Sequence, residues 1–176
     1  MGRATESDIL EAFAEQIAGL KVGGVDSVVI ETMVSLEEAV LAVKAAKETA
    51  SLVVMATMVF DRTPQGFQTI MGVTPKKAVE ELQRAGADIV GANCGSGIGV
   101  MLELARELRQ STDGYILVHS NAGIPSIKDA GIFYPESRDY MAEGFKRLAE
   151  IGINIIGGCC GTGPDHIRAL RKVIRG

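Results

Sequence analysis

The sequence predicts an α/β fold in which parallel strands alternate with helices. Short apolar runs typical of buried strands alternate with amphipathic segments, and the polar residues that could carry chemistry gather where the apolar runs end. With 176 residues, 47% of them hydrophobic and 23% charged, we expect one globular domain over residues 1–176. In such a fold, open or closed, function lies at the carboxyl ends of the strands.

The first half of the chain is predicted to open with a capped amphipathic helix. Thr5 or Ser7 precedes acidic residues as a helix start should, apolar residues follow at helical spacing, and a glycine pair at 23–24 ends the helix. Thr74 followed by Pro75 is a second helix start. The expected elements, in order, are a helix over 5–20, a strand over 25–31, a helix over 35–47, a strand over 52–59 and a helix over 74–85.

The second half continues the alternation of strand and helix. Its apolar runs are short and bounded by turn-forming residues, which favours strands, and Pro164 marks the start of the last helix. The expected elements are a strand over 88–93, a helix over 99–110, a strand over 115–119, a long loop over 121–135, a helix over 136–151, a strand over 154–158 and a helix over 164–174. The polar residues at or just after the strand ends are Glu31, Asp61, Cys94, Asn121, Cys159 and Cys160.

The composition argues against several classes of function. The formal net charge is -4, Lys and Arg form no cluster, and there is no tryptophan, so we expect no nucleic-acid partner. No apolar run approaches the roughly 18 residues that suggest a membrane span, and no signal-like segment leads the sequence, so we expect no membrane association. Free thiols belong in a reducing compartment, and we expect the cytoplasm.

The three cysteines of the chain, Cys94, Cys159 and Cys160, all follow apolar strands. Three thiolates from two strand ends can hold zinc tetrahedrally and leave the fourth position open for a substrate. A second interpretation is that they are small buried hydrophobic residues, the usual role of a free cysteine. Adjacent residues of a regular strand point to opposite faces, so Cys159 and Cys160 can share a ligand only where the strand bends. Glycines that would permit this bend lie at 157, 158, 161 and 163.

Four strand ends carry motifs of a known family. Residues 91–94 read Gly-Ala-Asn-Cys, residues 157–162 read Gly-Gly-Cys-Cys-Gly-Thr, Glu31 precedes Thr32, and residues 119–123 read His-Ser-Asn-Ala-Gly. Taken in chain order, these motifs resemble the homocysteine S-methyltransferase family, most closely the homocysteine-binding module of cobalamin-dependent methionine synthase. The resemblance implies a TIM-type (βα)8 barrel nearly twice as long as this chain. It therefore implies a partial barrel of about five strands, truncated at its N-terminal side by the first three βα units.

The same resemblance implies roles for the site residues. Cys94, Cys159 and Cys160 would hold Zn2+ and act as the catalytic centre. Glu31 would hold the amino group of homocysteine. Asn121 would lie beside the metal and ligate it weakly when no thiol is bound.

The glycine-rich turn and the two histidines are less specific. Gly161, Thr162 and Gly163 precede a helix start and resemble a phosphate cradle, yet the same donors could take a substrate carboxylate, so we assign Gly161 and Thr162 to substrate binding. His119 is predicted in the barrel core or behind the metal ligands. His166 is predicted to face solvent.

The implied activity is methylation of homocysteine to methionine, a step of methionine biosynthesis. Neither His119 nor His166 fits the Asp-x-His-x-x-Gly signature of cobalamin modules, so we expect methylcobalamin on a corrinoid-protein partner. Two alternatives stay open. One is a metal-free phosphate-binding barrel enzyme that uses residues 161–163, and the other is a non-catalytic truncated fragment or interaction subunit.

The two outer strands of the predicted sheet lack the features that protect exposed edges. Strands 25–31 and 154–158 would be unpaired without the first three units, and both are apolar. The sequence therefore predicts a homo-oligomer or a complex with a subunit that completes the barrel.

Overall fold

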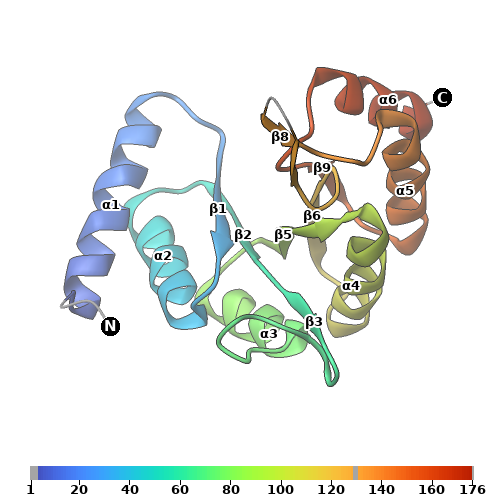
Figure 1. The fold of residues 1–176 in the computed structure, drawn as a ribbon. Coiled ribbons are helices and arrows are strands. Elements are labelled where there is room, and N and C mark those ends of the chain that lie inside the picture. The colour runs from blue at the N-terminus through green and yellow to red at the C-terminus, as the bar shows by residue number, and fades with distance from the viewer. Residues whose placement is uncertain (1–3, 129–130, 176) are drawn as a thin grey trace.

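The computed structural model describes residues 4–128 and 131–175, and within these ranges six helices lie along one face of a five-stranded parallel sheet (Figure 1). The helices are α1 (Glu6–Val22), α2 (Leu36–Thr49), α3 (Pro75–Ala85), α4 (Ile98–Ser111), α5 (Arg138–Ile151) and α6 (Pro164–Arg175). The strands of the sheet are β1 (Ser27–Met33), β2 (Val53–Met58), β5 (Ile89–Gly97), β6 (Tyr115–Asn121) and β9 (Ile155–Gly158). The predicted alternation of strand and helix is confirmed.

Side-chain caps determine where the helices begin. Thr5 accepts a hydrogen bond from the Asp8 N–H, and the Thr5 N–H donates to the Asp8 carboxylate, which makes a reciprocal capping box at the start of α1. Ser35, Thr74 and Ser137 cap α2, α3 and α5 with one side-chain oxygen each.

One predicted helix start was wrong by two residues. The helix expected over 136–151 begins at Arg138, because Ser137 takes the capping position. The Glu136 carboxylate instead accepts the Ile98 N–H over 2.9 Å at the first turn of α4, where the helix dipole favours negative charge. Glu136 therefore ties the loop before α5 to the start of α4.

The two faces of the sheet differ in burial. The strand order β1-β2-β5-β6-β9 follows the chain, and all neighbours are parallel. Ala56, Val90 and Ile116 share one row across the sheet and are fully buried. Val29 and Tyr115 share a row on the opposite face and are 39% and 64% exposed. The sheet is thus a partial TIM-type barrel with a helix-covered outside and an open inside, and β1 and β9 are its edges.

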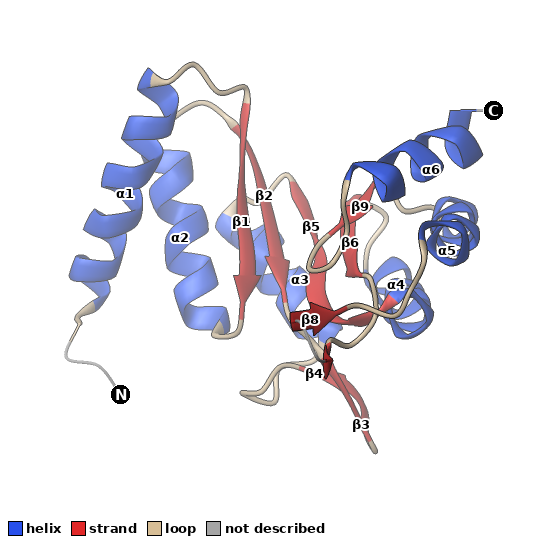
Figure 2. Cartoon of the chain, turned by 45° about the horizontal axis from the view of Figure 1, so that its top comes forward, coloured by secondary structure: helices blue, strands red, loops and turns tan. Residues whose placement is uncertain are grey.

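Two short hairpins were not predicted. β3 (Asp61–Thr63) pairs with β4 (Gly66–Gln68), and β7 (Ser126–Lys128) pairs with β8 (Gly131–Phe133), both antiparallel. Strands of three residues are too short to show an alternating pattern, so sequence reasoning placed β7 and β8 in the loop over 121–135. Part of that loop, residues 129–130, lies outside the described residues. Figure 2 shows the hairpins at the end of the sheet toward which the β1 and β2 arrows point.

Among the described residues, none of the helices combines the length and the apolar character needed to cross a membrane.

Candidate metal centre

The structure brings the three thiols together at the carboxyl end of the sheet. The sulfur of Cys160 lies 3.9 Å from that of Cys94 and 4.0 Å from that of Cys159, and all three sulfurs lie within 4.8 Å of one another. A tetrahedral zinc ion with Zn–S bonds of about 2.3 Å requires its sulfurs to be about 3.8 Å apart. We call these three residues the thiol cluster. Its geometry fits a shared metal ion.

The end of β5 presents Cys94 through an uncommon backbone conformation. Cys94 has φ +62°, in the left-handed region, and Gly95 follows with φ +71°. The pairing of β5 with β6 is irregular between Asn93 and Gly97, so the strand bends at the cysteine. A non-glycine residue in this region costs on the order of 1–3 kcal/mol and persists only where its surroundings hold it.

The Asn93 side chain holds this strand end through hydrogen bonds to β1 and β2. Its side chain is 1% exposed, and its oxygen accepts hydrogen bonds from the Thr32 N–H at 2.8 Å and the Thr57 hydroxyl at 2.7 Å. Its amide nitrogen donates to the Thr32 hydroxyl at 2.7 Å and lies 3.8 Å from the Cys159 sulfur. Thr32 also has φ +62°, which is rare for a β-branched residue. The Asn93 side chain thus links β1, β2, β5 and the thiol cluster.

The end of β9 is held by β6 on one side. The Cys159 N–H donates to the Ser120 carbonyl at 2.7 Å, and the Cys160 carbonyl accepts the Ala122 N–H at 2.9 Å. Gly161 then turns the chain with φ +78°. These bonds place both cysteines in the turn that follows β9.

The glycines before the two cysteines serve packing and not the predicted bend. A Cβ on Gly157 would lie 2.7 Å from the His119 ring, and a Cβ on Gly158 would lie 2.3 Å from the Thr162 hydroxyl oxygen. Both residues belong to the regular strand β9. Among the four glycines predicted to permit the bend, Gly161 is the one with a positive φ.

Asn121 bridges the two strand ends. It is 3% exposed, and its amide nitrogen donates to the Gly95 carbonyl at 3.1 Å and to the Cys94 sulfur at 3.6 Å. Its oxygen accepts the Cys160 N–H at 3.0 Å. The predicted neighbour of the metal therefore contacts the thiol cluster and sets the distance between its two halves.

The thiols of the cluster differ in acidity. Burial raises the pKa of the Cys94 thiol, but hydrogen bonds from the Asn121 amide, the Gly95 backbone and the other two thiols outweigh burial, so this pKa lies below its ordinary value. Burial, followed by the charge on Cys159, raises the pKa of the Cys160 thiol to about 11. The Cys94 thiol therefore loses its proton before that of Cys160.

Glu31 lies within β1 and not at its end, because the strand continues to Met33 through an irregular pairing with β2. Its side chain is exposed. Burial lowers the pKa of His119, and the negative charge of Glu31 partly opposes that shift. His119 packs against Gly157 inside the barrel. Glu31 connects to the thiol cluster through its neighbour Thr32 and the Asn93 side chain.

The glycine-rich turn uses several of its donors internally. The hydroxyl and N–H of Thr162 both donate to the Cys159 carbonyl, at 2.7 and 3.2 Å. The Gly163 N–H donates to His166 Nδ1 at 3.1 Å, and the other ring nitrogen lies 3.4 Å from the Glu136 carbonyl oxygen. His166 is half-buried and braces the turn, so the prediction that it faces solvent was wrong.

Sequence reasoning missed Asn93 and Tyr134. Tyr134 comes from the loop before α5, and its ring lies on Gly161, where a Cβ would be 2.1 Å from the ring. Partial burial first, and then the charge on the Cys160 thiol, raise the pKa of the Tyr134 phenol. Asn93 could have been noticed as a polar residue in an apolar strand, whereas nothing local marks Tyr134.

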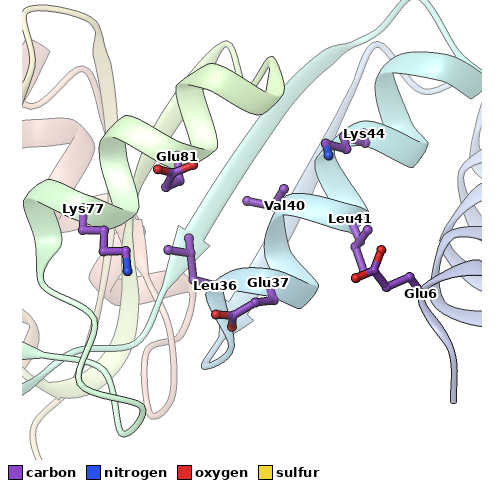
Figure 3. A pocket seen from close by; sticks show the side chains of 8 residues that line it. All are labelled: Glu6, Leu36, Glu37, Val40, Leu41, Lys44, Lys77 and Glu81. Carbon is purple, nitrogen blue, oxygen red and sulfur yellow. The ribbon is translucent and has the colours of Figure 1, made fainter.

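A cavity elsewhere on the molecule lies apart from the thiol cluster. A cavity of about 400 Å³ lies between α2 and α3, lined by Leu36, Val40, Lys44, Lys77 and Glu81 among others (Figure 3). It lies among the outer helices and contains none of the thiols. We interpret it as a groove between packed helices.

Comparison with known proteins identifies the family. The family model described as homocysteine S-methyltransferase matches residues 1–174. Methionine synthases of Mycobacterium leprae and Mycobacterium tuberculosis are each 31% identical to the chain over 182 residues, a match that covers 99% of this chain and 15% of each relative.

Solved structures show the same fold. The homocysteine methyltransferase MmuM from Escherichia coli superposes with a TM-score of 0.73 in its apo form and 0.72 in its metallated form, with 19% identity. These matches cover 93% of this chain and 57% and 51% of the MmuM chains, so the chain spans little more than half of them. N-acetylneuraminate lyase from Mycoplasma synoviae shares the fold at 15% identity with a TM-score of 0.56. On the match over residues 1–174 and the methionine synthase relatives, the chain belongs to the homocysteine S-methyltransferase family.

Proposed function

We propose that the chain is the zinc-binding, homocysteine-activating part of a homocysteine S-methyltransferase. The spacing of the thiol cluster carries the proposal, because sulfurs 3.9 and 4.0 Å apart suit a shared tetrahedral ion. A set of three thiolates favours zinc among the common divalent metals. When bound, zinc would make an incoming fourth thiol ionise at neutral pH.

The chain's own residues prepare the site for this substrate. Asn121 holds the two cysteine-bearing strand ends at a defined separation, which supports the proposal that its amide lies beside the metal and yields to homocysteine. We propose that the exposed Glu31 carboxylate takes the amino group, since Asn93 ties the backbone next to Glu31 to the thiol cluster. Substrate contacts from Gly161 and Thr162 stay a prediction, because Thr162 already donates to the Cys159 carbonyl.

The reaction is a transfer of a methyl group to sulfur. The homocysteine thiol loses its proton to solvent on binding, and its sulfur supplies the electron pair of the new S–CH3 bond. The bond between the methyl group and its donor breaks, and the donor leaves with that pair. The chain spans 15% of the methionine synthases that it resembles. We therefore place the donor, proposed as methylcobalamin, on a corrinoid-protein partner or on another part of a longer protein.

We also propose that the edges of the sheet are covered in the active protein. A groove of about 300 Å³ lies between α1 and the edge strand β1, and its lining includes Phe13, Leu20 and Val29. Apolar edges of this kind pair with other strands. A second copy of the chain or a barrel-completing subunit would cover them. We also propose a cytoplasmic location, because free thiols need a reducing compartment.

Zinc and homocysteine binding test the proposal together. The purified chain should hold about one equivalent of zinc, and titration with homocysteine in buffers of different ionisation enthalpy should show about one proton released at pH 7. Homocysteine binding without proton release would contradict thiolate ligation. A chain that binds homocysteine and that light scattering shows to be a stable monomer would contradict the proposal that the sheet edges are covered.

The phosphate-binding alternative finds less support in the turn at 161–163. The N–H groups of Thr162 and Gly163 both bond within the protein. Weak binding of inorganic phosphate, measured by calorimetry on the metal-free chain, is the expected outcome.

A further inference from the structure

A segment of three residues crosses the strand ends that carry the thiol cluster. Each of its residues fills the space left open by a glycine of a different strand end, because a Cβ on that glycine would lie 2.8 Å or less from it. The pairs are Tyr134 with Gly161 after β9, Pro135 with Gly123 after β6, and Glu136 with Gly97 at the end of β5. We call residues 134–136 the strap.

Glu136 connects the two strand ends that bear the cysteines. Its N–H donates to the Ala122 carbonyl at 3.0 Å, and the Ala122 N–H donates to the Cys160 carbonyl at 2.9 Å. Its carboxylate accepts the Ile98 N–H at 2.9 Å, and Ile98 follows Cys94 by four residues. One residue therefore bonds toward both halves of the thiol cluster.

The strap is short and stiff enough to set a separation. A chain spans at most about 7 Å over the two residues from Tyr134 to Glu136. Pro135 fixes its own φ and restricts the backbone of the residue before it. The turn after β9 and the start of α4 therefore cannot move apart without the loss of one of the strap's contacts.

A shared metal ion is sensitive to this separation. The sulfur of Cys160 lies 3.9 Å from that of Cys94, close to the spacing of about 3.8 Å that a tetrahedral ion with thiolate ligands requires. Binding sites need their groups held to within about 0.5 Å by the surrounding packing and hydrogen bonds. The end of β9 lies at an edge of the sheet, so the strap supplies a second link beside its pairing with β6.

We propose that the strap is the positioning element of the metal centre, with Glu136 as its main positioning residue. It holds the start of α4 and the turn after β9 at the separation at which Cys94 and Cys160 share a metal ion. Glu136 acts through Ile98 and Ala122, and not as a ligand. The proposal rests on the proposed function, because it needs a metal ion in the thiol cluster.

Metal affinity of the purified chain tests the proposal. Glu136→Ala removes the acceptor of the Ile98 N–H and should weaken Co2+ and Zn2+ binding roughly tenfold, measured by competition with a chelator. Glu136→Gln keeps a side-chain oxygen for that N–H, so its affinity should fall between those of Glu136→Ala and the wild type. The matched control is Glu150→Ala, an exposed glutamate near the end of α5, which should match the wild type.

A glycine variant displaces the Glu136 carboxylate without removing it. Gly97 has φ −75° and ψ 178°, which alanine adopts without strain, so the carboxylate is what opposes a Cβ at this position. Gly97→Ala should push the carboxylate away from the Ile98 N–H and weaken metal binding as much as Glu136→Ala does. The double variant should bind no more weakly than either single variant, because both changes remove the same contact.

The Co2+ spectrum separates positioning from structural support. The visible d–d bands of the Co2+-loaded chain report how closely the site approaches tetrahedral geometry, and they should lose intensity in Glu136→Ala and in Gly97→Ala. A purely structural role would lower the stability of the metal-free chain in urea and leave the bands and the metal affinity unchanged.

Three outcomes would overturn the proposal. The first is an unchanged metal affinity in both Glu136→Ala and Gly97→Ala, the second is a loss in the double variant equal to the product of the two single losses, and the third is a lowered stability with an unchanged spectrum. If Glu136→Ala does not fold, Gly97→Ala and Glu136→Gln carry the same test. Zinc content of the wild-type chain is measured first: a wild-type chain without zinc overturns the proposed function as well, whereas one equivalent of zinc with unchanged affinities in the variants overturns this inference alone.

Discussion

The two strand ends that supply the thiols are built in different ways. The end of β5 lies in the middle of the sheet, where Asn93 joins it to β1 and β2 and the left-handed Cys94 is held between neighbours on both sides. The end of β9 lies at an edge and is anchored to β6 and to its own turn. One half of the centre is therefore rigid by its position, and the other depends on a few local contacts.

Removal of one sulfur from either end should have the largest effect. Cys94→Ser, Cys159→Ser and Cys160→Ser should each reduce zinc from about one equivalent to a small fraction, because two thiolates bind far more weakly than three. Elemental analysis of each purified variant measures this, with Ser96→Ala, near the end of β5, as the control. Stoichiometric metal in all three serine variants would remove the basis for a shared site.

Loss of the polar support should cost more at β5 than at β9. Asn93→Leu leaves the buried Thr57 hydroxyl and the partly buried Thr32 N–H without their partner, at about 1–3 kcal/mol each, so we expect a loss of about 2–6 kcal/mol. Thr162→Val removes one hydroxyl bond at the edge and should cost about 1 kcal/mol. Urea denaturation of the metal-free variants gives both values. Equal losses would mean that the two ends are supported alike.

A matched pair of glycines separates backbone strain from packing. Gly95 has φ +71°, and a Cβ added to it would lie 3.4 Å from its nearest neighbour, the Phe60 carbonyl oxygen. Gly95→Ala should therefore lower the free energy of unfolding by about 1–2 kcal/mol through backbone strain alone. Gly161→Ala has φ +78° and also meets the Tyr134 ring, which should add about 1–3 kcal/mol.

The added cost should be recovered when the ring is removed. In a Tyr134→Ala background, Gly161→Ala should become as mild as Gly95→Ala, measured by the same denaturation experiment. A Gly161→Ala penalty that persists in this background would show that the ring does not cause it.

The smallest expected effect is a pH dependence that belongs to the β9 end. The Cys160 thiol has its pKa raised from 9.0 to about 11 in the folded chain. Between these values the unfolded chain has released this proton and the folded chain still holds it, so rising pH favours unfolding. The metal-free chain should therefore lose stability above about pH 9, and Cys160→Ser should lose less. Cys94 has the opposite effect, because its pKa is lowered in the folded chain. Its contribution to the stability of the folded chain grows as pH rises toward 9.0.

The main features of the fold and of the thiol cluster could be predicted because their signals are local. An apolar run followed by Cys and Gly indicates a strand end, and parallel strands bring such ends to one edge. The support of the cluster could not be predicted in this way. Asn93 bonds to Thr32, 61 residues away in sequence, and Tyr134 reaches Gly161 from a different loop. Gly157 looked like a bend residue, but its small size serves the His119 ring on the next strand.

The order of the strands has a consequence for how the centre is made. Each strand of the sheet pairs with the neighbour that precedes it in the chain, so the sheet can grow one unit at a time during synthesis, with short loops to close at each step. Cys94 is in place once β5 and β6 have met, but its partners Cys159 and Cys160 arrive with β9, which follows the other four strands of this sheet in sequence. A metal ion that binds all three sulfurs can therefore be retained only after the β9 unit has docked, and it would lock that unit onto the four strands already paired.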